Sequence, residues 1–251
     1  MNRLITLLDK DNSILNRRVN HVVLDAGSGL SRLFEPNIRK LVSQKSRLNI
    51  VLSHYHFDHV VGLPYLPAVW PEKPIRLFAP TFPYVDTTAE EAIARLINPP
   101  FFSFSLENYP NPTQLVPVSS PIKIGNYSFE FLRLEHDGGS VGMNINGKIS
   151  YITDTFVSRK YFDFIKDSEL VLHEVWMTRD EINDKNKQDA MRHSVFEDVI
   201  ELLLETNIKK LLPVHLNPKW DEEQIKLIFK DTEVDKLIIM FPEEGEGITL
   251  S

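Results

Sequence analysis

Apolar residues recur along the chain in short runs of the length that is typical of β-strands. Apolar residues at helical spacing lie between several of these runs and predict helices over Thr87–Leu96, Val195–Glu205 and Asp221–Phe229. Strands that alternate with helices are typical of an α/β fold. The predicted strands are His21–Leu24, Leu48–Leu52, Ile75–Ala79, Tyr127–Leu134, Ile149–Ile152, Leu170–Leu172, Lys210–Val214 and Leu237–Phe241.

One stretch departs from this pattern. Residues 97–121 contain six prolines together with Phe101, Phe102, Phe104 and Tyr109, which predicts a long irregular segment. Its aromatic side chains either pack the segment onto the core or form a wall of a substrate cleft. The sequence leaves both alternatives open.

The densest group of polar side chains follows the predicted strand Leu48–Leu52. Residues 53–59 read Ser-His-Tyr-His-Phe-Asp-His, so that His54, His56, Asp58 and His59 lie within six positions. Side chains at the carboxyl end of a strand in an α/β protein point into an open crevice. Imidazole suits zinc, iron or copper, and a carboxylate favours a hard divalent ion. This heptapeptide therefore predicts a metal site.

Three further metal-competent residues each come shortly after a predicted strand. They are His136, Asp154 and His215. Because several strands present such a residue at the same end, we expect these side chains to converge on one crevice edge.

In this order, the motifs resemble those of the metallo-β-lactamase superfamily in its hydrolytic form. Asp25 matches the first motif, the heptapeptide matches the second, and His136, Asp154 and His215 match the next three. The resemblance implies a four-layer αββα sandwich formed by residues 1–251 as a single domain, with two divalent metal ions.

The same resemblance assigns the metal ligands. It implies one ion held by His54, His56 and His136, and a second held by Asp58, His59 and His215. Asp154 is implied to bridge the ions, and Asp25 to fix the ligand loop through hydrogen bonds. Zinc is the expected metal, with manganese or iron as alternatives.

A second pair of residues indicates a branch of the superfamily. Glu174 ends a predicted strand, and His193 follows 19 residues later at the start of a predicted helix. This pairing resembles the phosphodiesterase branch, which includes ribonuclease Z and cyclic phosphodiesterases. It implies that Glu174 orients His193 and that His193 protonates the leaving oxygen.

Two departures from that branch affect the expected substrate. His136 and Asp154 are 18 positions apart, which leaves room for a turn and two strands but not for the transfer-RNA-binding arm of ribonuclease Z. Met1–Arg18 contains no glycine, although the superfamily usually has a glycine-rich loop before the first motif. At the other end, Gly245–Leu250 resembles the superfamily's terminal strand.

Composition narrows the possible partners. The chain has 251 residues, a net charge of −7 and no cysteine. The acidic charge argues against an extended nucleic-acid footprint, and no apolar run is long enough to span a membrane. The first ten residues do not resemble a secretion signal, so we expect a cytoplasmic protein. Homodimer formation is compatible with the resemblance.

We therefore predict a dinuclear metal-dependent phosphodiesterase that acts on a small phosphodiester, such as a cyclic nucleotide, through a metal-bridging hydroxide. Asp58, Glu174 and His193 are the predicted catalytic residues. The alternatives are a thioesterase or lactonase that uses the same metal site, an RNA 3′-processing nuclease, and a metal-binding domain without turnover.

Overall fold

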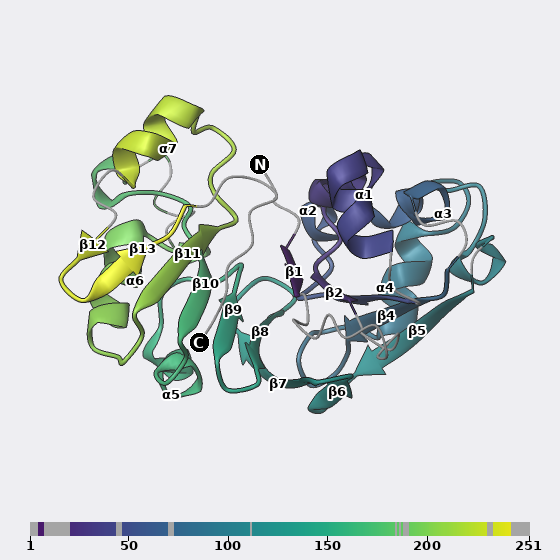
Figure 1. The fold of residues 1–251 in the computed structure, drawn as a ribbon, viewed down its shortest axis with the longest axis horizontal. Helices are drawn as coiled ribbons and strands as arrows, with labels where there is room; N and C mark the ends of the chain where they lie inside the picture. Colours follow the sequence, from purple (N-terminus) through teal and green to yellow (C-terminus); the bar gives the residue numbers. More distant parts are fainter. Residues whose placement is uncertain are drawn as a thin grey trace. The chain divides into compact units, whose positions relative to one another are not determined.

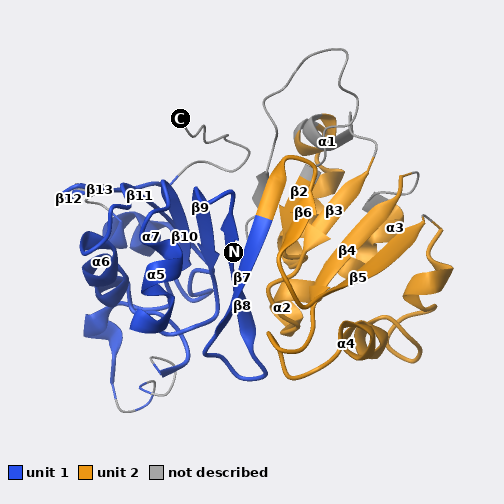
Figure 2. Cartoon of the chain, turned by 90° about the horizontal axis from the view of Figure 1, so that it is seen from below, with its two compact units in different colours: residues 1, 129–251 blue, residues 2–128 orange. Residues whose placement is uncertain are grey.

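The computed structural model describes residues 5–7, 21–43, 47–69, 73–110, 112–183, 185, 187, 191–229 and 233–241. The predicted terminal strand Gly245–Leu250 lies outside these residues, as does most of Met1–Arg18. The chain divides into two compact units, residues 2–128 and residues 129–251 together with Met1 (Figure 2). The combination of helices with mixed and parallel sheets confirms the predicted α/β class. That residues 1–251 act as one domain stays a prediction.

The first five strands of the unit of residues 2–128 form one sheet (Figure 1). Within the described residues its strand order is β1 (Ile5–Leu7), β2 (His21–Leu24), β3 (Leu48–Val51), β4 (Ile75–Pro80) and β5 (Thr113–Val118). β2 to β5 are parallel, and β1 is antiparallel to β2. The helices are α1 (Pro36–Ser43), α2 (Phe57–Val60), α3 (Leu66–Val69) and α4 (Ala89–Leu96).

Burial explains why the central strands of this sheet are continuous apolar runs. All four residues of β3 are buried, as expected for a parallel strand that is covered on both faces. Val23, Ile50 and Leu77, from three neighbouring strands, share one core cluster. This core holds the carboxyl ends of β2 and β3 in fixed positions.

The prediction of an irregular segment over residues 97–121 was wrong for its second half. Thr113–Val118 forms β5, which tolerates Pro117 because β5 is at the edge of the sheet. Phe102, Phe104 and Tyr109 pack against the core cluster, whereas the Phe101 side chain is 83% exposed. Packing onto the core is therefore the alternative that holds for three of the four aromatic residues.

The second sheet contains, in order, β12 (Glu233–Val234), β13 (Leu237–Ile239), β11 (Lys210–Val214), β10 (Leu170–Glu174), β9 (Ile149–Ile152), β8 (Ser140–Ile145), β7 (Tyr127–Leu134) and β6 (Ile122–Ile124). The boundary between the units falls inside β7. β9, β10, β11 and β13 are parallel, whereas β7, β8 and β9 pair antiparallel. The helices after residue 129 are α5 (Phe162–Ile165), α6 (Phe196–Leu204) and α7 (Glu222–Ile228).

The interval between His136 and Asp154 consists of a turn and two strands, as predicted. Gly138 and Gly139 adopt φ values of 78° and 86° in the turn, a conformation that glycine adopts without steric cost. β8 and β9 follow. No transfer-RNA-binding arm fits in this interval.

The described part of the chain contains no helix that is both long enough and apolar enough to cross a membrane.

Candidate metal centre and proton donor

Three of the predicted site residues adopt a backbone conformation that is rare for residues other than glycine. Asp25, Asp154 and His215 have φ values of 61°, 48° and 46°, and each lies directly after a strand or one residue further on. Such conformations cost free energy, and they persist where the surrounding structure holds them in place. At all three positions, the chain turns sharply at the carboxyl end of a strand, where it presents a polar side chain.

In the unit of residues 2–128, Asp25 organises the ligand loop. Asp25 Oδ2 accepts a hydrogen bond from His59 Nδ1 at 2.9 Å. The backbone N–H of Ser53 donates to Asp25 Oδ1 at 2.6 Å, and the Ser53 hydroxyl donates to Oδ2 at 2.9 Å. Burial by itself raises the pKa of Asp25, but the His59 and His54 rings and the Ser53 N–H outweigh this effect and hold the pKa below its ordinary value.

Ser53 extends this network to a second histidine. Its Oγ lies 3.0 Å from His54 Nδ1. Because a carboxylate only accepts, the hydroxyl hydrogen of Ser53 points to Asp25, and Oγ accepts the Nδ1–H of His54. Both His54 and His59 therefore carry their hydrogen on Nδ1, which leaves Nε2 as the lone-pair atom that can bind a metal.

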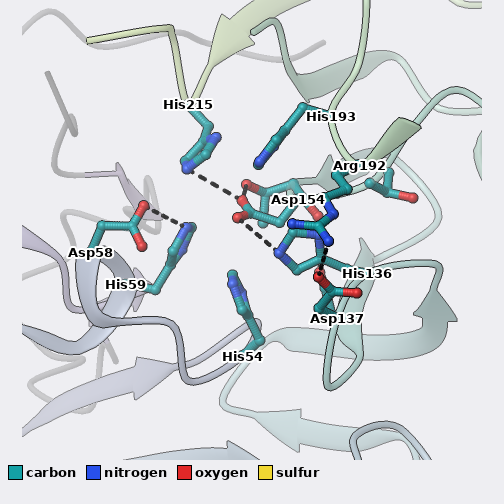
Figure 3. Close-up of polar contacts among 12 residues, drawn as sticks. His54, Asp58, His59, His136, Asp137, Asp154, Arg192, His193 and His215 are labelled. Atoms are coloured by element: carbon teal, nitrogen blue, oxygen red, sulfur yellow. Dashed lines mark hydrogen bonds and ion pairs between the residues drawn. The ribbon is translucent and has the colours of Figure 1, made fainter. Parts of the chain in front are cut away.

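The remaining ligands of the heptapeptide lie beside these two histidines. The ring of His54 is 4.7 Å from that of His56 and 4.3 Å from that of His59, measured between centroids. Asp58 Oδ2 is 3.4 Å from His59 Nε2 (Figure 3). His54 and His59 are buried, whereas His56 and Asp58 are exposed. The sequence prediction that these four side chains gather after β3 is consistent with this arrangement.

In the unit that begins at residue 129, Asp154 lies between two histidines. Its Oδ2 is 3.6 Å from His136 Nε2, and its Oδ1 is 3.4 Å from His215 Nε2 (Figure 3). Thr153 Oγ1 donates to Oδ1 at 2.7 Å and fixes the carboxylate. The two carboxylate oxygens thus face two different imidazoles.

Glu174 accepts hydrogen bonds on both of its oxygens. Its Oε2 accepts from His193 Nδ1 at 2.9 Å and from His215 Nδ1 at 3.2 Å. Its Oε1 accepts from the backbone N–H groups of Thr155 at 2.7 Å and Ser194 at 3.1 Å. Burial by itself raises the pKa of Glu174, but the hydrogen bonds from His193 and His215 lower it by a larger amount. The net pKa lies below its ordinary value, so the carboxylate stays ionised.

These bonds make the two histidines chemically different from an isolated imidazole. With Nδ1 of His215 donating to Glu174, the lone pair of its Nε2 faces Asp154. Burial lowers the pKa of His193, but the hydrogen bond and charge of Glu174 raise it more, so the net pKa lies above its ordinary value. His193 is therefore suited to carry a proton on Nε2 at neutral pH.

Trp176 packs beside both histidines. Its ring stacks on His193 at 4.5 Å and on His215 at 5.2 Å, with interplanar angles of 19° and 22°. The backbone N–H of Trp176 donates to Ser194 O at 3.0 Å. Asn217 Nδ2 donates to Trp176 O at 2.8 Å. The indole therefore restricts the orientation of the two imidazoles.

The chemistry of the donors fits a divalent metal ion. A neutral His215 presents the lone pair of Nε2 to a carboxylate oxygen at 3.4 Å, and two acceptors face each other stably only with a proton or cation between them. Glu174, His193 and His215 also form a compact group of metal-competent side chains. Histidine and aspartate donors are the set that zinc, manganese and iron accept.

Some functional residues were not predicted from the sequence. These residues orient the predicted site residues, but none is itself a predicted metal ligand or proton donor. They are Ser53, Thr153, Thr155, Ser194 and Trp176. Each stands next to, or two positions from, a predicted residue in the chain. This adjacency is the one signal that could have indicated them.

The comparisons with known proteins agree with the fold. Residues 20–216 match the family described as "Beta-lactamase superfamily domain". The chain is 25% identical over 228 residues to ribonuclease Z of Staphylococcus haemolyticus (strain JCSC1435), which covers 72% of this chain and 74% of that protein.

Solved structures show the same fold. One neighbour is described as a new diphosphatase from the PhnP family, with a TM-score of 0.61, 13% identity, and coverage of 88% of this chain and 77% of that one. Another is the short form of human tRNase Z, with a TM-score of 0.61, 15% identity, and coverage of 87% of each chain.

The chain belongs to the metallo-β-lactamase superfamily, and within it the chain is similar to ribonuclease Z. It is a metal-dependent hydrolase of that superfamily, as the sequence predicted.

Proposed function

We propose that the chain is a dinuclear phosphodiesterase that hydrolyses a small phosphodiester, such as a cyclic nucleotide. In this proposal, His54, His56 and His136 hold one divalent ion, and Asp58, His59 and His215 hold a second. Asp154 bridges the ions, and zinc is the expected metal. The orientation of Nε2 on His54, His59 and His215 within their own units supports this assignment.

The bound ions would supply an acidified water and stabilise negative charge on the phosphoryl oxygens. The chain's own residues would supply the proton transfer. His193 would donate its Nε2 proton to the leaving alkoxide, which is a poor leaving group until it is protonated. Glu174 would hold the ring of His193 in position and stabilise its protonated form.

The hydrogen bond between Glu174 and His193 is the observation that carries this proposal. It measures 2.9 Å, and the Glu174 side chain is fully buried. A thioester releases a stable thiolate and has less need of such a proton donor, whereas a phosphodiester releases an alkoxide. A strongly held general acid therefore favours the phosphodiester.

Two further observations support a small substrate. The interval from His136 to Asp154 holds only the turn, β8 and β9. The net charge of −7 disfavours a long nucleic acid. The names of the relatives, a ribonuclease and a diphosphatase, are consistent with chemistry at phosphorus.

The test compares three substrates on metal-loaded protein: the dinucleotide ApA, whose leaving group is an alkoxide, a p-nitrophenyl carboxylic ester and a thioester. We expect diester cleavage that falls by ~10²–10⁴-fold in His193→Ala, the range of general acid catalysis. Arg179→Gln, which alters an exposed side chain, should leave the rate unchanged. Ester or thioester cleavage that is indifferent to His193 would instead identify a carbonyl hydrolase.

A further inference from the structure

A cavity of about 510 Å³ opens beside His136 in the unit that begins at residue 129. Its volume lies within the ~300–1,000 Å³ typical of small-molecule sites. All of its lining residues belong to this one unit. They are Arg133, Leu134, Glu135, His136, Asp137, Phe156, Lys160, Met191 and Arg192.

The position of the cavity relates it to the proton donor. Arg192 directly precedes His193 in the chain. The ring of His136, which lines the cavity, lies 5.4 Å from the ring of His193. If His193 protonates the leaving oxygen, the rest of the leaving group extends from that oxygen into the space next to these residues.

The charges around the cavity favour an anion. Three cations and two carboxylates line it, in a chain whose overall net charge is −7. Arg192 pairs with Asp137 (Figure 3). Lys160 pairs with Glu135. All four side chains are at least 40% exposed, and such exposed ion pairs contribute little free energy, so a ligand can replace them.

Arg192 is held more loosely than comparable arginines of the same unit. Its Nη2 lies 3.4 Å from Asp137 Oδ2. By contrast, Arg159 contacts both oxygens of Glu205 at 2.5 and 2.6 Å, and Arg179 contacts Asp198 and Glu201 at 2.5 and 2.9 Å. A guanidinium has five N–H donors in a planar fork that matches a phosphate. The fork of Arg192 therefore retains donors for a ligand.

The apolar side of the cavity is suited to contact a planar ring, such as that of a nucleobase. Phe156 and Leu134 line it, and the Met191 side chain is 72% exposed beside them. Methionine is common at adaptable binding surfaces, and its sulfur makes favourable contacts with aromatic rings. The cavity thus combines a surface for a base with cations for a phosphate.

We propose that the cavity beside His136 binds the leaving group of the substrate, and that this leaving group carries a phosphate of its own, as a nucleotide does. The preferred substrate would then be a phosphodiester with a second, non-scissile phosphate, and Arg192 would be the residue that selects it. The assignment of the cavity to the leaving group rests on the proposed function, whereas its affinity for a phosphate does not.

The kinetic test uses three dinucleotides with the same scissile bond: ApA, pApA and ApAp. One of the two phosphorylated forms places its phosphate on the leaving nucleoside. For zinc-loaded wild-type protein, we expect kcat/KM for that form to exceed the value for ApA by about tenfold or more, or about 1.4 kcal/mol. In Arg192→Gln this ratio should fall below about threefold. In Arg179→Gln, the matched control, the ratio should be unchanged.

A binding test separates this proposal from the proposed function. Calorimetry would compare adenosine 3′,5′-bisphosphate with the two adenosine monophosphates on the zinc-loaded protein. We expect the second phosphate to improve Kd by about tenfold in the wild type and in Arg179→Gln, but not in Arg192→Gln. Equal unfolding temperatures would show that the variants are folded.

The outcomes are distinct. If no diester is cleaved but the second phosphate binds through Arg192, the proposed function fails and the phosphate site stands. If diesters are cleaved but neither assay shows a preference for the second phosphate, the cavity proposal is overturned. A preference that persists in Arg192→Gln also overturns it, because the phosphate is then bound elsewhere, such as at the metal ions.

Discussion

Asp25 shows how one buried carboxylate can orient two histidines. It binds His59 directly and reaches His54 through the Ser53 hydroxyl. Because the orientation of His54 depends on Ser53 Oγ, a serine that the sequence does not distinguish from any other becomes part of the site. Asp25 itself was predictable from its motif, whereas the relay through Ser53 depends on a donor–acceptor geometry that no residue pattern encodes.

Ser53→Ala should weaken metal binding without unfolding the protein. The Ser53 N–H still donates to Asp25, but His54 loses the acceptor of its Nδ1–H. Loss of a partner that orients a ligand typically lowers metal affinity by ~10–100-fold. Competition with a chromophoric chelator measures this affinity. Ser31→Ala, which alters an exposed serine that donates to Ser28 O at 2.7 Å, is the control. An affinity equal to that of the wild type would contradict the relay.

His173 gives a stability prediction that depends on pH. Its Nδ1 donates to Glu174 O at 2.9 Å, and its Nε2 accepts from Tyr161 at 3.0 Å, so the neutral ring is satisfied on both sides. Burial lowers the pKa of His173 from its ordinary value of 6.5. Below pH 6.5, the unfolded chain therefore binds a proton that the folded chain does not, and stability falls.

We expect protonation of His173 in the unfolded chain to reduce the free energy of unfolding by up to about 1 kcal/mol between pH 6.5 and 5.5. The variant His173→Gln cannot titrate at this position, so it should not show this pH-dependent loss of stability. Urea unfolding of both proteins at the two pH values measures the difference, and their shared metal ligands cancel in the comparison. Equal losses in the wild type and the variant would show that His173 is not the group responsible.

At the scale of elements, the sequence predicted best where periodicity and capping agree. α7 begins after Asp221, whose side chain accepts from Gln224 N at 2.8 Å, in line with the acidic start read from the sequence. The bounds of β8 were not predicted, because Gly142 and Asn144 interrupt its apolar pattern, although all six of its residues are buried and the spacing between His136 and Asp154 left room for this strand. Pairing with β7 and β9 overrides weak local propensity there.

The segment that follows the heptapeptide of residues 53–59 packs closely on the turn at Asp25. Ala26 N donates to His59 O at 2.9 Å, and Gly62 N donates to Ala26 O at 2.7 Å. A Cβ on Gly62 would lie 2.4 Å from Gly27 O and 2.7 Å from Ala26 O, both backbone atoms. This glycine therefore permits the close approach that brings Asp25 to His59.

Gly62→Ala should destabilise the fold by ~1–3 kcal/mol, the usual cost of overpacking, and should weaken metal binding in parallel. Gly142→Ala is the comparison, because a Cβ there meets the flexible end of the Ile152 side chain at 2.9 Å rather than backbone. The loss of free energy of unfolding should be smaller in Gly142→Ala than in Gly62→Ala. Chemical denaturation with metal titration tests both variants, and an equal effect of the two substitutions would contradict the argument.

At the scale of the whole molecule, the proposed ligands come from both compact units. His54, His56, Asp58 and His59 belong to residues 2–128, and His136, Asp154 and His215 belong to the other unit. The parallel strands of each sheet explain why ligands separated in sequence reach one edge within their own unit. An ion that takes ligands from both sets couples the stability of the two units, so measurements of unfolding with and without metal test this assignment.

If each ion binds only the folded protein, zinc at ~100 times its Kd should stabilise the chain by about 2.7 kcal/mol for each bound ion. Because the proposed ions take ligands from both units, His54→Ala and His215→Ala should each reduce this gain, and a single cooperative unfolding transition should shift as a whole. Scanning calorimetry with and without a chelator measures the effect, and Arg179→Gln should retain the full gain.

If zinc stabilised only one of two separate transitions, or if one histidine variant kept the full gain, the ions would not join the two ligand sets. The dinuclear assignment would then have to be replaced by a site within one unit, where Glu174, His193 and His215 already form a compact group.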